Sequence, residues 1–167
     1  MNIIFQDIDG PLIPLRMYFG GSRPFNLQAG SFVYDPVAVG MLNHLCEKFG
    51  ARVVFNSAHN ENPHDRMKHQ GTVNGLKYLH DDCKTDYNIL ITKGRLASIE
   101  DWIERNAILK CKWIVIDDIV VDKPNQVLVD YNVGMTIDNY YRACYLFGEK
   151  VSTIIGIGQQ NPNNYQE

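Results

Sequence analysis

Two aspartates separated by a single residue, Asp7 and Asp9, end an apolar stretch near the start of the chain, and Gly10 follows directly. Carboxylates this close repel each other and retain protons unless a cation lies between them. A glycine at this point lets the backbone turn sharply and approach a ligand closely. Charges that served only solubility would be scattered along the stretch. We therefore predict that the pair binds a cation at the end of a strand.

Further polar side chains follow three more apolar stretches in the same way. Asn56 and Ser57 come at the end of one stretch, Lys93 follows the next, and Asp117 and Asp118 end the last. The carboxyl ends of parallel strands meet at one edge of a sheet, and ligands of α/β proteins bind there. If each stretch is such a strand, four strand ends bring together four carboxylates, a hydroxyl and an ammonium.

This set of groups suits phosphoryl transfer assisted by magnesium. Hard oxygen ligands without a nearby cysteine–histidine pair favour Mg²⁺ over zinc, and Mg²⁺ commonly binds one or two carboxylates together with phosphate oxygens. Ser57 and Lys93 could hold and neutralise a bound phosphate. One aspartate can attack phosphorus to form an aspartyl-phosphate, and a second can protonate the leaving oxygen and then activate water.

Apolar stretches and helical patterns alternate along the chain. The predicted strands are residues 2–6, 52–56, 88–92 and 113–117, with a weaker fifth at residues 126–129. Helices are predicted from Asp35, an N-cap followed by proline, to Gly50, over the periodic apolar residues 96–103, and from Thr136 onward. Strands that alternate with helices favour parallel pairing with right-handed crossovers. The predicted fold is therefore a three-layer α/β/α sandwich with a mainly parallel, Rossmann-like sheet.

Length and composition place the chain among ordinary globular proteins. Its 167 residues suit one domain, predicted at 1–155 and followed by a polar tail at 156–167. The net charge of −3 gives no support to nucleic-acid binding through bulk electrostatics. We find no apolar run of the roughly 18 residues that a membrane span needs, no basic start typical of a signal peptide, and no metal-binding spacing among the cysteines. We therefore expect a cytoplasmic protein with reduced thiols and no membrane partner.

Four motifs resemble, in the family order, those of the haloacid dehalogenase-like (HAD) phosphohydrolases. They are "IIFQDIDGPL", "RVVFNSAHN", "ITKGRLASIEDW" and "WIVIDD", and they cover residues 2–118. The later stretch "VDYNVGMTIDNYYRA" resembles the end of a smaller HAD group associated with RNA-repair proteins, mainly through Gly134-Met135-Thr136. The resemblance implies a HAD fold, a magnesium cofactor and a phosphorylated substrate.

The resemblance also implies a role for each residue of the first two motifs. Asp7 corresponds to the nucleophile, with its other oxygen on Mg²⁺, and Asp9 to the general acid/base, with its backbone carbonyl on the metal. Ser57 would hold a phosphoryl oxygen. Gly10 and Asn56 would contribute to substrate binding beside these groups.

The third and fourth motifs supply a cation and further metal ligands. Lys93 would neutralise the phosphate and the nucleophile, although Arg95 competes for this role because both lie at the start of the same predicted helix. Asp118 would bind Mg²⁺ directly or through water, with Asp117 in support. Which of the two cations and which of the two aspartates takes the direct role stays open.

The chain departs from the related group after Ser57, where that group often has an aromatic–arginine pair. Here Ala58-His59-Asn60 follows, so a substrate-binding arginine would have to be replaced by Arg16, Arg23 or Arg66. Residues 12–34 and 58–87, the two places where HAD caps are inserted, are too short for an independent cap domain, and the second should hold little beyond one helix. An open site would admit large substrates such as phosphorylated polymer ends.

The loop at residues 12–34 is the predicted substrate loop, with Arg16, Arg23 and the aromatic residues Tyr18, Phe19 and Phe25. Arginine and aromatic side chains together suit a phosphate with a stacked base. A loop that only packs its aromatic residues on the core would look the same in sequence.

The leading hypothesis is a Mg²⁺-dependent phosphomonoester hydrolase that acts on a nucleotide or a nucleic-acid end. The alternatives are a phosphatase of a small metabolite or phosphoprotein, and a catalytically silent HAD-like binding module, which the intact pair Asp7 and Asp9 argues against. A calcium loop is disfavoured because Leu12 stands where an EF-hand needs glycine. A hydrolase built on Ser57 and His59 is disfavoured because the G-x-S-x-G motif is absent. The sequence does not indicate an oligomeric state.

Overall fold

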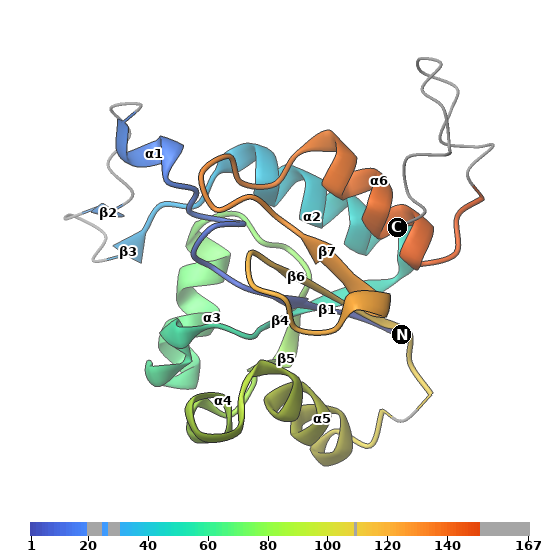
Figure 1. Cartoon of the computed structure of the whole chain (residues 1–167). Helices are drawn as coiled ribbons and strands as arrows, with labels where there is room; N and C mark the ends of the chain where they lie inside the picture. Colours follow the sequence, from blue (N-terminus) through green and yellow to red (C-terminus); the bar gives the residue numbers. More distant parts are fainter. Residues whose placement is uncertain (20–24, 27–30, 109, 151–167) are drawn as a thin grey trace.

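The computed structural model describes residues 1–19, 25–26, 31–108 and 110–150 (Figure 1). Arg23 and the predicted polar tail at 156–167 lie outside the described residues. Among the described helices, none combines the length and the apolar character needed to cross a membrane.

Five parallel strands form one sheet, with the first strand of the chain at its centre (Figure 1). In their spatial order they are β5 (Leu79–Lys84), β4 (Ala51–Phe55), β1 (Asn2–Gln6), β6 (Trp113–Asp117) and β7 (Gln126–Leu128). In the register of the sheet, Gln6 lies between Phe55 and Ile116. The residues that follow β1, β4 and β6 therefore emerge side by side at one edge of the sheet, as the sequence predicts.

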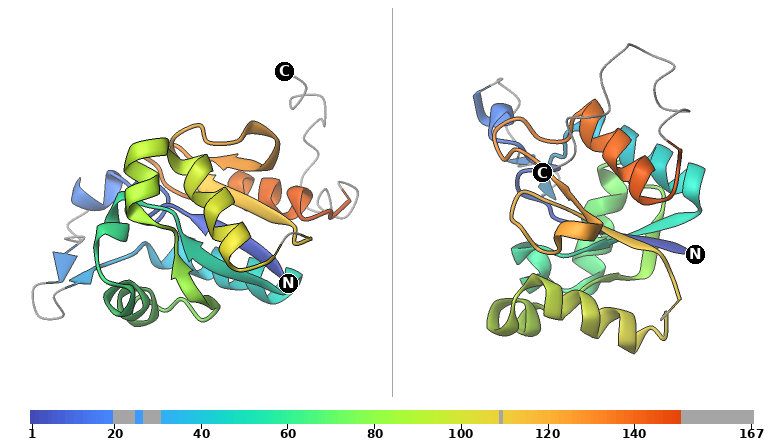
Figure 2. Two further views of the ribbon diagram at one scale, coloured as in Figure 1. Left: turned by 90° about the horizontal axis from the view of Figure 1, so that it is seen from below. Right: turned by 45° about the vertical axis from the view of Figure 1, so that its right-hand side comes forward.

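Helices cover both faces of this sheet, which confirms the predicted three-layer α/β/α sandwich (Figures 1 and 2). One face packs against α2 (Pro36–Phe49), α3 (His64–Val73) and α6 (Ile137–Leu146), and the other against α5 (Arg95–Arg105). Ile4 of β1 belongs to the first core, whereas Ile3 and Phe5 point to the second, as alternation along a strand requires. Phe5 meets Trp102 of α5 edge to face, with ring centroids 5.4 Å apart.

The predicted helix caps are confirmed. Asp35 Oδ1 accepts a hydrogen bond from the Val37 backbone N–H at the start of α2, and Gly50 ends the helix in the left-handed conformation at φ 60°. Thr136 begins α6 with a reciprocal pair of hydrogen bonds to Asn139, a capping box. These caps satisfy backbone groups that helix ends otherwise leave unpaired.

The predicted strand at residues 88–92 is wrong, because this stretch forms helix α4 (Tyr87–Lys93). Asp86 caps the helix by accepting hydrogen bonds from the backbone N–H groups of Asn88 and Ile89. The apolar side chains of α4 are only half-buried or exposed, so they do not need the interior of a sheet. The strand that takes the predicted place is β5, whose polar sequence "LHDDCK" fits its position at the edge of the sheet.

The segment at residues 58–87 contains more secondary structure than the single helix that the sequence predicts. It contains a short 3-10 helix, η1 (Ala58–Glu61), as well as α3 and β5. The segment at residues 12–34 contains α1 (Arg16–Phe19) and a pair of two-residue strands, β2 (Phe25–Asn26) and β3 (Ser31–Phe32), beyond one end of the sheet (Figure 1). The described residues of both segments form no separate cap domain.

Candidate active site

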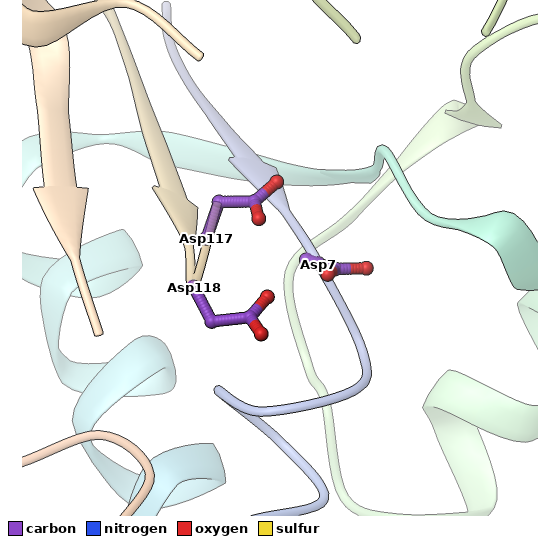
Figure 3. Close-up of side chains that lie close together, drawn as sticks. All are labelled: Asp7, Asp117 and Asp118. Atoms are coloured by element: carbon purple, nitrogen blue, oxygen red, sulfur yellow. The ribbon is translucent and has the colours of Figure 1, made fainter. Parts of the chain in front are cut away.

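The carboxyl ends of β1 and β6 bring three aspartates together. Asp7 follows β1, Asp117 ends β6 and Asp118 follows it (Figure 3). Each contributes one carboxylate oxygen to a set whose members all lie within 4.8 Å of one another. The backbone N–H of Asp7 donates to the carbonyl of Ile116 at 2.9 Å, which continues the β1–β6 pairing beyond the strand and fixes Asp7 against Asp117. Asp7 and Asp117 are almost completely buried.

Arg95, the first residue of α5, lies against this cluster. Its Nη2 donates to Asp7 Oδ2 at 3.0 Å, and its Nη1 lies 3.0 Å from Asp117 Oδ2. Nη1 also donates to the backbone carbonyl of Asn56 at 2.5 Å. Lys93, by contrast, is exposed at the end of α4 and has no ion-pair partner among the described residues. Of the two cations considered from sequence, the structure therefore brings Arg95 to the aspartates.

Asn56 connects the site to the fold. Its side-chain Oδ1 accepts hydrogen bonds from Thr85 Oγ1 at 2.9 Å and from Ser98 Oγ at 2.8 Å, and Asn56 is fully buried. Its carbonyl accepts the hydrogen bond from Arg95. With its amide and its carbonyl both engaged, Asn56 holds α5 and Arg95 in place rather than facing a substrate.

Burial raises the pKa of Asp7 and of Asp117. For Asp7 the main cause is desolvation, which Arg95 and a hydrogen bond from Ser57 only partly offset. For Asp117, desolvation and the nearby charge of Asp7 raise the pKa to about 8. Asp117 Oδ2 is buried and accepts no well-aligned hydrogen bond in the described part of the chain. Arg95 supplies one positive charge to three clustered carboxylates, so the cluster keeps an excess of acidic groups. An all-oxygen set of this kind fits a hard cation such as Mg²⁺.

Asp9 lies apart from the three clustered carboxylates and contacts His59 of η1. The distance from Asp9 Oδ2 to His59 Nε2 is 3.2 Å, and the side chain of Asp9 is 49% exposed. The hydrogen bond to Asp9 is the main cause that raises the pKa of His59. Ser57, buried at the start of the same turn, accepts a hydrogen bond from the His59 backbone N–H at 3.4 Å.

Two glycines allow close packing around these residues. Gly10 has a φ of 79°, and a Cβ atom added there would lie 3.0 Å from the Cβ and Cγ atoms of Asp118. Gly134 has a φ of 78°, and its added Cβ would lie 2.8 Å from Pro14. Any larger residue at position 10 would displace Asp118 or strain the backbone. The role of Gly10 is thus to admit an aspartate side chain.

The arginines considered as replacements for a substrate-binding arginine do not converge on the cluster. Arg16 forms an ion pair with Asp35, the N-cap of α2, although half of its side chain is exposed. Arg66 is exposed on α3, and Arg23 lies outside the described residues. Sequence reasoning considered His59 only as a partner of Ser57 and missed its contact with Asp9. His59 lies two residues after Ser57, in the turn that follows β4, and β4 pairs with the strand that precedes Asp9. This position is the signal that could have placed His59 near Asp9.

A parallel sheet with an aspartate after its central strand, an acidic pair after the neighbouring strand and a cation at a helix start defines the class of HAD-like proteins. In agreement, the family model for the HAD domain in Swiss Army Knife RNA repair proteins matches residues 3–139, and the chain belongs to this family. Comparisons with curated proteins and with solved structures gave no match. The resemblance noted from the motifs is therefore confirmed at the level of the family.

Proposed function

We propose that the protein is a Mg²⁺-dependent phosphomonoester hydrolase that works through an aspartyl-phosphate on Asp7. The observation that carries the proposal is the placement of Asp7, which is buried in contact with Arg95 and close to Asp117 and Asp118. Membership of a HAD family supports a hydrolase of this class. The intact pair Asp7 and Asp9 disfavours a silent binding module.

The proposed metal ligands are Asp7, Asp118 and the backbone carbonyl of Asp9, with Asp117 in support. Two observations favour a cation here. Burial and the nearby charge of Asp7 raise the pKa of Asp117, and a buried oxygen of Asp117 has no well-aligned hydrogen bond. When bound, Mg²⁺ would supply positive charge to the cluster and to a phosphoryl oxygen of the substrate.

In the first proposed step, a carboxylate oxygen of Asp7 attacks phosphorus and the bond to the leaving oxygen breaks. Asp9 gives its proton to that oxygen, and the released alcohol leaves. In the second step, the Asp9 carboxylate takes a proton from water, which attacks the phosphorus and returns Asp7 and inorganic phosphate. The half-exposed position of Asp9 at the edge of the cluster suits a group that must meet both a leaving group and water.

Arg95 is the proposed cation for the phosphoryl group, in place of Lys93. Its guanidinium is already oriented by Asp7, Asp117 and the carbonyl of Asn56, so a phosphate bound at Asp7 would lie beside a fixed donor. Ser57, which is buried and follows β4 after Asn56, is the proposed hydroxyl partner of a phosphoryl oxygen.

The proposed substrate is the phosphate of a nucleotide or of a nucleic-acid end. The RNA-repair description of the family supports this class, and the absence of a cap among the described residues leaves Asp9 accessible to a large substrate. A small metabolite or a phosphoprotein is the alternative, since the residues proposed to hold the phosphate do not indicate what is attached to it.

A panel of phosphorylated compounds tests the proposal. Phosphate release should be measured from an aryl phosphate, from nucleotides, and from oligonucleotides with a 3′- or a 5′-phosphate, each with Mg²⁺ and with excess chelator. We expect Mg²⁺-dependent release that is fastest from a nucleotide or from one of the oligonucleotides and absent in Asp7→Asn. Full activity in chelator would contradict the metal, and equal rates on all substrates would contradict the nucleic-acid assignment.

A further inference from the structure

His59 and Asp9 form a contact that the catalytic scheme above does not use. The Nε2 atom of His59 lies 3.2 Å from Asp9 Oδ2, although the two residues are 50 positions apart in sequence. Asp9 Oδ1 has no hydrogen-bond partner among the described residues. The contact thus engages one oxygen of the proposed acid/base and leaves the other available for proton transfer.

The side chain of Asp9 needs such a partner because of where it lies. Its carboxyl is 49% exposed at the edge of the site, outside the carboxylate cluster formed by Asp7, Asp117 and Asp118. An exposed aspartate rotates about its side-chain bonds, and general acid catalysis requires the donor to stay within hydrogen-bond reach of the leaving oxygen. A fixed hydrogen bond to one oxygen removes part of this freedom.

His59 itself is well placed to act as a fixed partner. Its side chain is only 17% exposed, and its ring packs edge to face against Phe32 of β3 with centroids 5.0 Å apart. Its backbone N–H donates to Ser57 Oγ at 3.4 Å, and its carbonyl accepts from the backbone N–H of Asn62 at 3.0 Å and from Asn62 Nδ2 at 2.8 Å. Backbone and ring are therefore both held.

The turn that carries His59 is anchored to the sheet. Lys84 of β5 donates through Nζ to the carbonyls of Asn60 at 2.7 Å and Asn62 at 2.5 Å. Asn60 is fully buried, and its Nδ2 donates to the carbonyl of Phe55 at 2.8 Å, the last residue of β4. The position of His59 is thus set by β5 and by β4, the strand that Ser57 follows.

We infer that His59 is a positioning residue that holds the Asp9 carboxyl for proton transfer to the leaving group. This inference rests on the proposed function. Ser57 and His59 belong to one short turn, so the distance between them is fixed. Ser57 is the proposed partner of the phosphoryl group, and His59 orients the acid Asp9. The turn therefore couples phosphate binding to the placement of the proton donor.

The dependence on the leaving group distinguishes this role from a contact with the phosphate. An aryl phosphate such as p-nitrophenyl phosphate hardly needs a proton on its leaving oxygen, whereas an alkyl phosphate does. His59→Phe keeps an aromatic ring for the packing against Phe32 and removes the hydrogen bond. We expect it to lower kcat on an alkyl phosphate about 10- to 100-fold, to change kcat on the aryl phosphate by less than about threefold, and to leave KM unchanged for both.

A conservative variant and a double mutant complete the test. His59→Gln places a side-chain amide nitrogen near the position of Nε2, and it should recover most of the loss on the alkyl phosphate. In the background of Asp9→Asn, His59→Phe should have no further effect, because the group that it positions no longer transfers a proton. Glu61→Gln, at an exposed residue of the same turn, is the matched control and should leave both rates unchanged.

Each remaining outcome contradicts the inference. Equal losses on both substrates with a raised KM would assign His59 to substrate binding, and unchanged kinetics in His59→Phe would leave it without a role. If His59→Phe does not fold, the test uses His59→Gln alone. The inference is then contradicted if His59→Gln remains well below wild-type activity on the alkyl phosphate relative to its activity on the aryl phosphate. A wild type that releases no phosphate from any substrate contradicts the proposed function and this inference together, whereas the other outcomes leave the proposed function intact.

Discussion

Arg95 Nη2 donates a hydrogen bond to Asp7 Oδ2 at 3.0 Å, and the two residues are 88 positions apart in sequence. The same guanidinium reaches Asp117, so one cation lies between the aspartates that follow β1 and end β6. Burial and these two carboxylates make Arg95 part of the site, whereas Lys93 remains in solvent. The arrangement explains how two like charges can be buried at adjacent strand ends.

The first prediction separates the two candidate cations. Arg95→Lys keeps the charge but loses the planar fork that contacts two carboxylates, and it should lower kcat/KM about 100-fold. Lys93→Ala removes an exposed charge that water and salt screen, so kcat/KM should change by less than about threefold. Steady-state kinetics on an aryl phosphate measure both. A larger loss in Lys93→Ala than in Arg95→Lys would reverse the assignment.

The second prediction concerns the stability of the metal-free protein as a function of pH. Burial and Asp7 raise the pKa of Asp117 from 3.8 to about 8. Between these values the folded protein binds a proton that the unfolded chain has lost, so stability should fall as the pH rises from about 4 to about 8. Asp117→Asn removes this effect and should gain on the order of 1–3 kcal/mol at pH 8 and nothing near pH 4.

Thermal or denaturant unfolding in excess chelator measures this effect. Asp138→Asn, at an exposed residue of α6, is the matched control for the loss of one carboxylate and should leave the pH profile unchanged. If the free energy of unfolding of the wild type rises between pH 5 and pH 8 relative to Asp117→Asn, the proposed repulsion within the cluster is absent.

The third prediction uses the close approach of Gly10 to Asp118. Gly10→Ala would add a Cβ atom 3.0 Å from the Asp118 side chain at a backbone φ of 79°. It should destabilise the protein by about 1–2 kcal/mol and, by displacing a proposed ligand, weaken Mg²⁺ binding about 10-fold or more.

Gly40→Ala is the matched control, because a Cβ atom at position 40 of α2 meets nothing within 4 Å. Alanine has a higher helix propensity than glycine, so this variant should be more stable by about 0.5–1 kcal/mol. Its affinity for Mg²⁺ should be unchanged. Melting curves at increasing Mg²⁺ concentrations give both quantities. Equal Mg²⁺ affinities in Gly10→Ala and the wild type would exclude Asp118 as a ligand.

The fourth prediction concerns Lys84, which holds the turn that carries His59. Lys84→Met removes the donor to the carbonyls of Asn60 and Asn62 while keeping most of the side-chain volume. It should destabilise the protein by about 1–3 kcal/mol and lower kcat on aryl and alkyl phosphates alike, because the whole turn loosens. A loss confined to alkyl phosphates would instead indicate that Lys84 acts only through Asp9.

The strands that carry the site could be predicted because each is an uninterrupted apolar stretch that ends in polar residues. The sequences before Asp7, Ser57 and Asp117 belong to β1, β4 and β6, which are buried on both faces, and their pattern therefore has no competing interpretation. The caps at Asp35 and Thr136 were equally predictable, because local hydrogen bonds alone determine them.

The strand β5 could not be predicted, because its sequence is polar rather than an uninterrupted apolar stretch. β5 lies at the edge of the sheet, where polar residues are tolerated, whereas the apolar stretch at 88–92 forms α4 under the local influence of the Asp86 cap. This misplaced strand made Lys93 appear to follow a strand end. The role of Arg95 depends on the direction in which α5 begins, which local sequence does not determine. The contact between His59 and Asp9 depends on a turn held by Lys84, so local sequence does not predict this contact either.

The central claim is that Asp7 carries the phosphoryl group during the reaction. Rapid acid quench of the protein with Mg²⁺ and substrate, followed by peptide mass spectrometry, tests it directly, because an acyl-phosphate survives in acid long enough to be located. We predict a phosphoryl adduct on the peptide that contains Asp7, assigned to that residue by fragmentation and absent in Asp7→Asn. An adduct on Ser57 or His59, or undiminished turnover by Asp7→Asn, would contradict the account.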